Sequence, residues 1–134
     1  MRAKMRARIQ IQSCDAGSLS LKLTPAQAAL FRECIALTLE AHDQDAMTEL
    51  CTGSPRRELE NIAKGVTQMP ENASDICTFT LGQLHSIYAS ITHAVVALPS
   101  EETFHIRTGF YRENAIALAN SMRSTVRDCM RSDL

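Results

Sequence analysis

Apolar and polar positions alternate in two short runs near the start of the chain, which is the pattern of half-buried β-strands. From Arg8 to Cys14, isoleucines alternate with glutamines, and a second run of three alternating leucines follows the turn residues Asp15–Ser18. A third run, Ile76–Thr80, is rich in residues that favour strands. We therefore predict an N-terminal β-hairpin and a third strand in one small antiparallel sheet.

Longer stretches repeat apolar residues every three or four positions, which predicts about four helices packed on the sheet. The first begins at Pro25, because Thr24 and Gln27 form a capping box, and it ends in polar residues near Asp45. The other helices are expected at about 55–66, 80–98 and 111–130, and residues 103–107 are expected to be extended or loop-like. The predicted fold class is α+β.

The order of strand, capped helix, Thr-Gly break and helix occurs twice, at the constant offset that places Thr24 on Thr80. Between residues 20–66 and 76–122, 8 of 47 aligned pairs are identical, against about three expected from ordinary composition. Apolar positions pair as well, for example Leu50 with Ile106, which predicts that both face the core. We predict two β-α-α units, 19–66 and 75–122, in a pseudo-two-fold arrangement; the alternative is convergence of capping residues.

Composition limits the classes of function. The 134 residues suit a single domain, and the net charge of −1 argues against a nucleic-acid binder. No apolar stretch of about 18 residues exists, so no membrane span is expected. Residues 1–7 form a basic tail without the apolar region of a secretory signal. The five cysteines contain no C-x-x-C pair, so we expect reduced, mostly buried thiols and a cytoplasmic protein.

Acidic residues gather where the first helix ends, namely at Glu40, Asp43, Asp45 and Glu49. The spacing is not that of an EF-hand, so a calcium site is not indicated. A solvated acidic rim is the simplest interpretation, and a binding patch for a basic protein is the alternative.

A second candidate segment, residues 102–113, holds half of the six aromatic residues together with His105, Arg107, Tyr111 and Arg112. Arginine with tyrosine is typical of binding hot spots, although the same residues could serve packing and a glycine turn. No metal-binding motif, P-loop or nucleophile motif is present, so we expect no metal, no cofactor and no enzyme activity.

The segment from Phe79 to Met122 resembles a group of small, mostly uncharacterised bacterial proteins with the pattern E-x-F-H-x-R-T-G-F-x-R-E-x-A-x-x-L. The matching residues are Glu102, Phe104, His105, Arg107, Thr108, Gly109, Phe110, Arg112, Glu113, Ala115 and Leu118. Some proteins of this style are associated with toxin–immunity systems, so the resemblance implies an immunity-type binder. The first unit departs from the pattern, because Cys51 stands where Arg107 stands in the second.

The sequence leaves three hypotheses for the function. The first is a non-enzymatic immunity or antitoxin-type protein that occludes a cognate bacterial toxin, with the acidic residues facing a basic toxin domain. The alternative is a small-molecule-binding or regulatory domain with a pocket near His105 and Arg107, where the arginine would hold a carboxylate or phosphate. A third, weaker hypothesis is an enzyme that uses a Cys/His pair. A homodimer is compatible with either of the first two.

Overall fold

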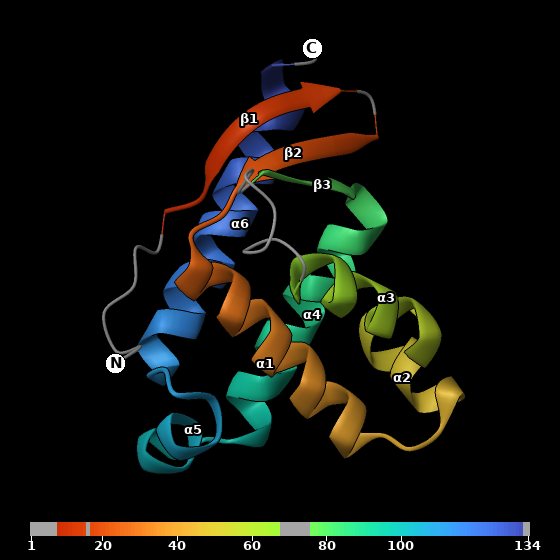
Figure 1. The fold of residues 1–134 in the computed structure, drawn as a ribbon, viewed down its shortest axis with the longest axis vertical. Helices are drawn as coiled ribbons and strands as arrows, with labels where there is room; N and C mark the ends of the chain where they lie inside the picture. Colours follow the sequence, from red (N-terminus) through yellow and green to blue (C-terminus); the bar gives the residue numbers. More distant parts are fainter. Residues whose placement is uncertain (1–7, 16, 68–75, 133–134) are drawn as a thin grey trace.

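The computed structural model describes residues 8–15, 17–67 and 76–132, which form a three-stranded sheet and six helices (Figure 1). The predicted α+β class, the N-terminal hairpin and the third strand are confirmed. The predicted basic tail, 1–7, lies outside the described residues. The strands are β1 (Gln10–Asp15), β2 (Ser18–Lys22) and β3 (Ile76–Thr80). The helices are α1 (Pro25–Ala41), α2 (Asp45–Thr52), α3 (Arg56–Thr67), α4 (Leu81–Ala97), α5 (Glu101–Thr108) and α6 (Arg112–Ser132).

The sheet is antiparallel with the strand order β1-β2-β3. In the turn between β1 and β2, Gly17 has a φ of 82°, a left-handed conformation that glycine adopts without steric cost. β1 carries an irregularity between Ile11 and Ser13. The middle strand, β2, alternates buried leucines with more exposed polar residues, because one face of the sheet covers the core.

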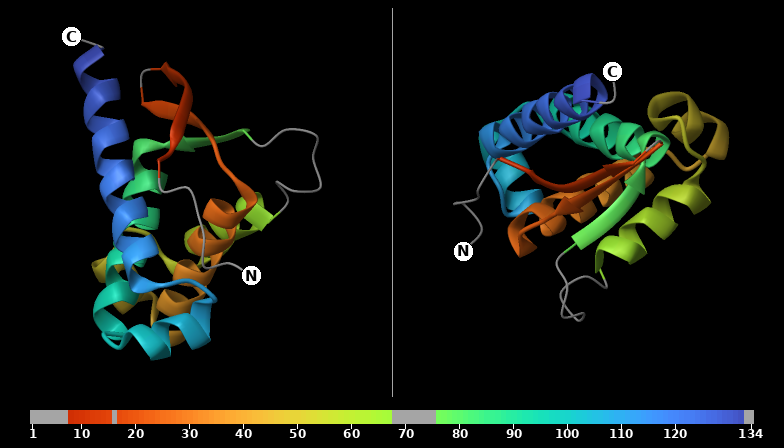
Figure 2. Two further views of the ribbon diagram at one scale, coloured as in Figure 1. Left: turned by 90° about the vertical axis from the view of Figure 1, so that its left-hand side faces the viewer. Right: turned by 90° about the horizontal axis from the view of Figure 1, so that it is seen from above.

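Helices α1 and α4 start directly after β2 and β3 and cross as they run away from the sheet (Figure 1). Helices α2 and α3 lie on one side of this crossing, and α5 and α6 lie on the other (Figure 2). The core fills the space between the inner face of the sheet and the crossing helices. Its largest fully buried side chains are Phe31, Phe104, Phe110, Leu19, Leu21, Leu23, Leu30, Ile35, Leu59, Ile87, Ile91 and Leu118.

Each long helix that follows a strand begins with the same local device. The Thr24 hydroxyl accepts a hydrogen bond from the Gln27 backbone N–H at 3.1 Å, and the Gln27 side chain accepts from the Thr24 N–H at 3.0 Å. Thr80 and Gln83 make the same two contacts at 3.1 and 2.9 Å. These capping boxes satisfy backbone donors that the first helical turn leaves free, so the predicted helix starts are confirmed.

Two short helices were not expected. Residues 103–107, predicted to be extended or loop-like, belong to α5, and the acidic segment after α1 forms α2. Each of these eight-residue helices buries only two side chains one turn apart, Thr48 and Thr52 in α2, and Phe104 and Thr108 in α5. A pattern of two positions is too short to distinguish a helix from a loop by periodicity. The repeating unit is therefore β-α-α-α rather than the predicted β-α-α.

The two halves of the described chain follow one plan at the offset that places Thr24 on Thr80. Helices α1 and α4 have 17 residues each, α2 and α5 have eight each, and α3 and α6 start at corresponding positions. Gly53 and Gly109 end α2 and α5 with nearly identical backbone angles, φ 80° and 81°. The correspondence ends within α6. This helix continues to Ser132, whereas the same offset places Ser132 on Ile76, where β3 begins.

The turn after each short helix is held by the same hydrogen bonds. The Thr52 hydroxyl donates to the Thr48 carbonyl at 2.8 Å and accepts from the Ser54 N–H at 3.2 Å. The Thr108 hydroxyl donates to the Phe104 carbonyl at 2.8 Å and accepts from the N–H two residues further on at 3.0 Å. Buried threonines therefore close both turns, which accounts for the Thr-Gly pair in the two units.

The expectation of five reduced cysteines is wrong for two of them. Cys14 on β1 and Cys129 on α6 form a disulfide with a Cα–Cα distance of 6.2 Å. The two residues are 115 positions apart, and only the packing of β1 along α6 brings them together. Cys34, Cys51 and Cys77 take no part in a disulfide, as predicted.

Candidate functional site

The two surfaces predicted from the sequence meet at the end of the molecule opposite the sheet. This end, which we name the helical end, consists of α2, α5 and the C-terminal ends of α1 and α4 (Figure 1, Figure 2). Arg107 on α5 donates through Nη2 to Glu40 Oε2 on α1 at 2.5 Å. The two side chains are 41% and 63% exposed, so this ion pair is a surface contact that contributes about 1 kcal/mol or less.

The remaining acidic candidates separate into two roles. Asp45 accepts a hydrogen bond through Oδ1 from the Arg56 backbone N–H at 3.1 Å, and so caps the start of α3. Its counterpart in the second half, Glu101, accepts from the Arg112 N–H at 2.6 Å. Asp43 and Glu49 are exposed, and they are the carboxylates of this group best placed to meet a partner.

Arg112, predicted as a binding residue, is half-buried and connects helices. Its Nη2 donates to the Val95 carbonyl in the last turn of α4 at 3.2 Å, and its Nε is buried without a hydrogen-bond partner among the described residues. Arg56 makes the corresponding contacts with the carbonyls of Leu39, at 2.8 Å, and His42. Both guanidinium groups satisfy free carbonyls at a helix C-terminus, where positive charge is favoured. The arginine shared by the two units therefore serves the fold.

His105 and Tyr111 form a stacked pair that joins α5 to the start of α6. Their ring centroids are 4.6 Å apart and the rings are 11° from parallel. The Tyr111 side chain reaches solvent, whereas Nδ1 of His105 is buried and has no hydrogen-bond partner in the described part of the chain. Tyr111 is 36% exposed and stacks on a residue of the helical end, so the pair remains a candidate contact for a partner.

The helical end also exposes large aliphatic side chains. Leu50 is 77% exposed, Val96 is 77% exposed and Ile106 is 72% exposed, the three highest values for large hydrophobic residues in the described ranges. The prediction that Leu50 and Ile106 face the core is wrong, because the buried positions of α2 and α5 are taken by other side chains. Leu50 and Ile106 occupy corresponding positions in the two units, and this was the one feature of the sequence that related them.

The space beside Arg107 is small. A hollow of about 170 Å³ lies between the ends of α1 and α4, with Glu40 and Arg107 at its rim and alanine and leucine side chains inside. Ligand pockets usually measure about 300–1,000 Å³, and the charge of Arg107 is already balanced by Glu40. The geometry therefore gives little support to a carboxylate or phosphate pocket at His105 and Arg107.

A pair of histidines bridges α1 and α4. Nε2 of His42 lies 3.1 Å from Nε2 of His93, and burial followed by the charge of His42 lowers the pKa of His93 below its ordinary value. The positions that correspond to these two histidines in the other half are Leu98 and Leu37. Among the residues the structure describes, no three His, Cys, Asp or Glu side chains lie close enough to hold a metal ion.

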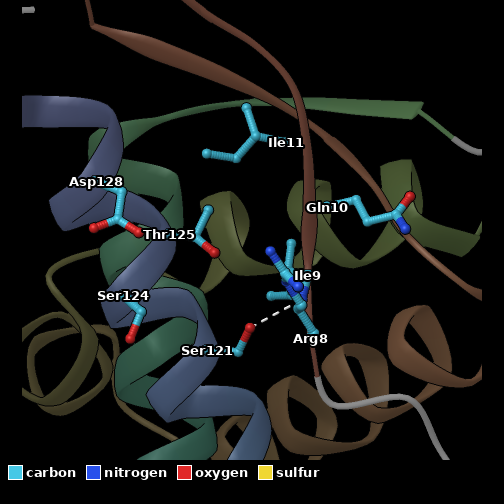
Figure 3. A pocket seen from close by; sticks show the side chains of 8 residues that line it. All are labelled: Arg8, Ile9, Gln10, Ile11, Ser121, Ser124, Thr125 and Asp128. Carbon is cyan, nitrogen blue, oxygen red and sulfur yellow. Dashed lines mark hydrogen bonds between the residues drawn. The ribbon is translucent and has the colours of Figure 1, made fainter. Parts of the chain in front are cut away.

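Two hollows flank the second half of α6. One, of about 840 Å³, lies between α6 and β1 (Figure 3). The Ile9 N–H donates to Ser121 Oγ at 2.9 Å near one end of this hollow, and the disulfide joins β1 to α6 beyond the other. Ile11 points toward α6, while Gln10 points away from it (Figure 3). The second hollow, of about 710 Å³, lies between α6 and the start of α4. Neither hollow was expected from the sequence.

Comparisons with known proteins identify no relative: no protein-family model, no curated protein and no solved structure matches this chain. No helix in the described ranges combines the length and the apolar character needed to cross a membrane.

Proposed function

We propose that this chain is a non-enzymatic, immunity-type protein that binds a basic partner, such as a toxin domain, through its helical end. The observation that carries the proposal is the exposure of Leu50, Val96 and Ile106 at that end, each above 70%. The three side chains come from three different helices, and a partner that covers this end would shield them from water.

The charges around this surface support a basic partner. Asp43 and Glu49 are exposed on the α1–α2 connection and on α2, on either side of the α3 cap made by Asp45. Carboxylates at the rim of an interface raise the rate of association with a basic protein and make that rate sensitive to salt. The small hollow at Arg107 offers less support to the alternative of a small-molecule domain.

The test expresses a candidate basic toxin domain from the native host together with this chain, and measures growth rescue and affinity. The double substitution Leu50→Asp and Ile106→Asp should weaken binding at least tenfold and abolish rescue. The matched control is Ile116→Asp on α6, a 43% exposed position outside the helical end. Rescue and affinity that survive the double substitution would exclude this surface.

The rim charges are tested separately, through kinetics. The substitutions Asp43→Lys and Glu49→Lys should slow association and reduce its salt dependence, with little change in dissociation. Asp45 is left unchanged because it caps α3, and Glu60→Lys, an exposed position on α3, serves as the control. An association rate equal to that of the wild type would remove the basic-partner part of the proposal.

The proposed compartment is the cytoplasm. There the Cys14–Cys129 disulfide would have to persist against a reducing glutathione pool, which keeps most cytosolic thiols reduced. Counting the free thiols of protein isolated from its native host, with the thiols blocked at lysis, tests this assignment. Three free thiols per chain would place the protein in an oxidising compartment, and five would support the cytoplasm.

A further inference from the structure

The groove between the start of α4 and the second half of α6 combines an apolar floor with a basic rim. It has a volume of about 710 Å³, within the range of small-molecule sites. Leu84 and Met122, each 3% exposed, form the floor, and Tyr88 and Val126 line it as half-buried side chains. Seen from above, α6 runs beside α4 (Figure 2), and the residues that line the groove come from these two helices. The groove therefore has an apolar floor.

The rim carries positive charge. Arg123 and Arg127 lie one turn apart on α6, so both side chains border the same stretch of the groove. His85 on α4 also lines it, and none of the described residues that line the groove is acidic. Arg127 pairs with its chain neighbour Asp128, whose Oδ1 lies 4.0 Å from Nε, and both side chains are more than half exposed. Such a pair is weak and leaves the arginine able to bind another anion.

The residues that line the groove, which belongs to the second half of the chain, differ from those at the corresponding positions of the first half. The positions that correspond to Leu84, His85 and Tyr88 are Ala28, Ala29 and Arg32. The two alanines are covered, at 0% and 5% exposure, whereas His85 is exposed. The α6 wall includes residues beyond the matching part of the two halves. The groove is therefore built where the second half departs from the first.

We propose that this groove binds a long-chain fatty carboxylate, with the hydrocarbon chain on the Leu84–Met122 floor and the carboxylate at Arg123 and Arg127. The apolar floor gains from burial of methylene groups, and a guanidinium binds a carboxylate through two parallel hydrogen bonds. The rim excludes a cationic amphiphile of the same length by charge. The inference is independent of the proposed partner surface, which lies at the helical end.

The test uses protein labelled with ¹³C on its methionine methyl groups and titrated with dodecanoate below its micelle concentration. The Met122 methyl signal should shift, while that of Met47, in the helical end, should not. Dodecyltrimethylammonium and dodecanol have chains of the same length, and each should bind at least tenfold more weakly than dodecanoate. A Met122 signal that does not move with dodecanoate would overturn the proposal.

Substitutions then separate the rim from the floor. The double substitution Arg123→Gln and Arg127→Gln should weaken dodecanoate binding at least tenfold and leave dodecanol binding unchanged, since only the carboxylate contact is lost. Arg57→Gln, an exposed position on α3, is the control. The methionine spectrum without ligand reports whether each variant is folded. Equal binding of the anionic and cationic amphiphiles to the wild type refutes the assigned head group, whatever the variants show.

Discussion

The disulfide between Cys14 and Cys129 gives the most direct prediction about stability. It closes a loop of 115 residues, nearly the whole chain, and it fixes the β1 edge of the sheet to the end of α6. Reducing the disulfide, or replacing both cysteines with alanine, frees the unfolded chain from this restriction. The folded contacts change little, so the effect is expected chiefly through the unfolded state.

The size of the effect follows from the length of the loop. The chain-entropy relation assigns a closed loop of this length about 5 kcal/mol of stabilisation at 25 °C. Domains of this size have total unfolding free energies of about 5–15 kcal/mol. The reduced protein is therefore expected to lose a third or more of the stability of the oxidised protein. Its urea midpoint should be clearly lower and its dependence on denaturant steeper, because the unfolded chain without the cross-link exposes more surface.

The assay combines urea unfolding with a count of free thiols. Oxidised protein unfolded without reductant should show three reactive thiols, and reduced protein should show five. In the folded state Cys51 and Cys77 should react first, because burial, and then the charge of Glu33, raise the pKa of the Cys34 thiol and keep it unreactive. The control is Cys51→Ala, which should keep the full sensitivity to dithiothreitol.

Two results would refute the reasoning. Five reactive thiols in purified protein that has been left to oxidise in air without reductant would show that the disulfide does not form. An unchanged urea midpoint after complete reduction, in a protein whose thiol count rises from three to five, would show that the loop closure does not stabilise the fold. The cysteine-to-alanine double variant separates the cross-link from the reagent, because dithiothreitol should have no effect on it.

Two further predictions concern single sites. Gly65→Ala in α3 should stabilise the protein by about 1 kcal/mol, because alanine favours a helix more than glycine does. Gly53→Ala should destabilise it by about 1–2 kcal/mol, because Gly53 has a φ of 80° and an added Cβ would lie 3.1 Å from an imidazole ring. Equal urea midpoints for the two variants would contradict this prediction. The lowered pKa of His93 means that the unfolded chain binds more protons below pH 6.5, so stability present above that pH is lost as the pH falls through the folded pKa. Replacing His42 and His93 with leucine, the residue at the corresponding positions of the other half, should reduce the change of the urea midpoint between pH 7.5 and 5.5. If the midpoint of this variant changes with pH as much as that of the wild type, the histidine pair is not the cause of the pH dependence.

The sequence predicts the features that depend on neighbouring residues. The capping boxes at Thr24 and Thr80 and the alternating strands each involve contacts within a few positions, so composition and spacing suffice. The constant offset between the two halves, visible in the sequence, reappears in the lengths of the helices and in the hydrogen bonds of Thr52 and Thr108. These features fix where the elements start and how they turn.

Features that depend on packing were not predictable. The ion pair of Glu40 with Arg107 and the disulfide join positions 67 and 115 residues apart, which no local pattern relates. The exposure of Leu50 is a consequence of which face of a two-turn helix touches the core, and eight residues give too few positions to decide it. The hollows beside α6 arise between elements and leave no periodic signal. The sequence therefore indicates the candidate segments but not their partners.

The joining of β1 to α6 has a consequence for the order of folding. Contacts within each half link nearby positions, such as Arg56 with the carbonyl of Leu39, 17 residues away. The contact of Ile9 with Ser121 spans 112 residues, and loop closure becomes entropically more costly as the intervening chain lengthens. Low sequence separation favours fast formation, so the helical units are expected to assemble early and the first strand to dock late. The edge of the sheet, where the first strand meets the last helix, is then the last part to become native.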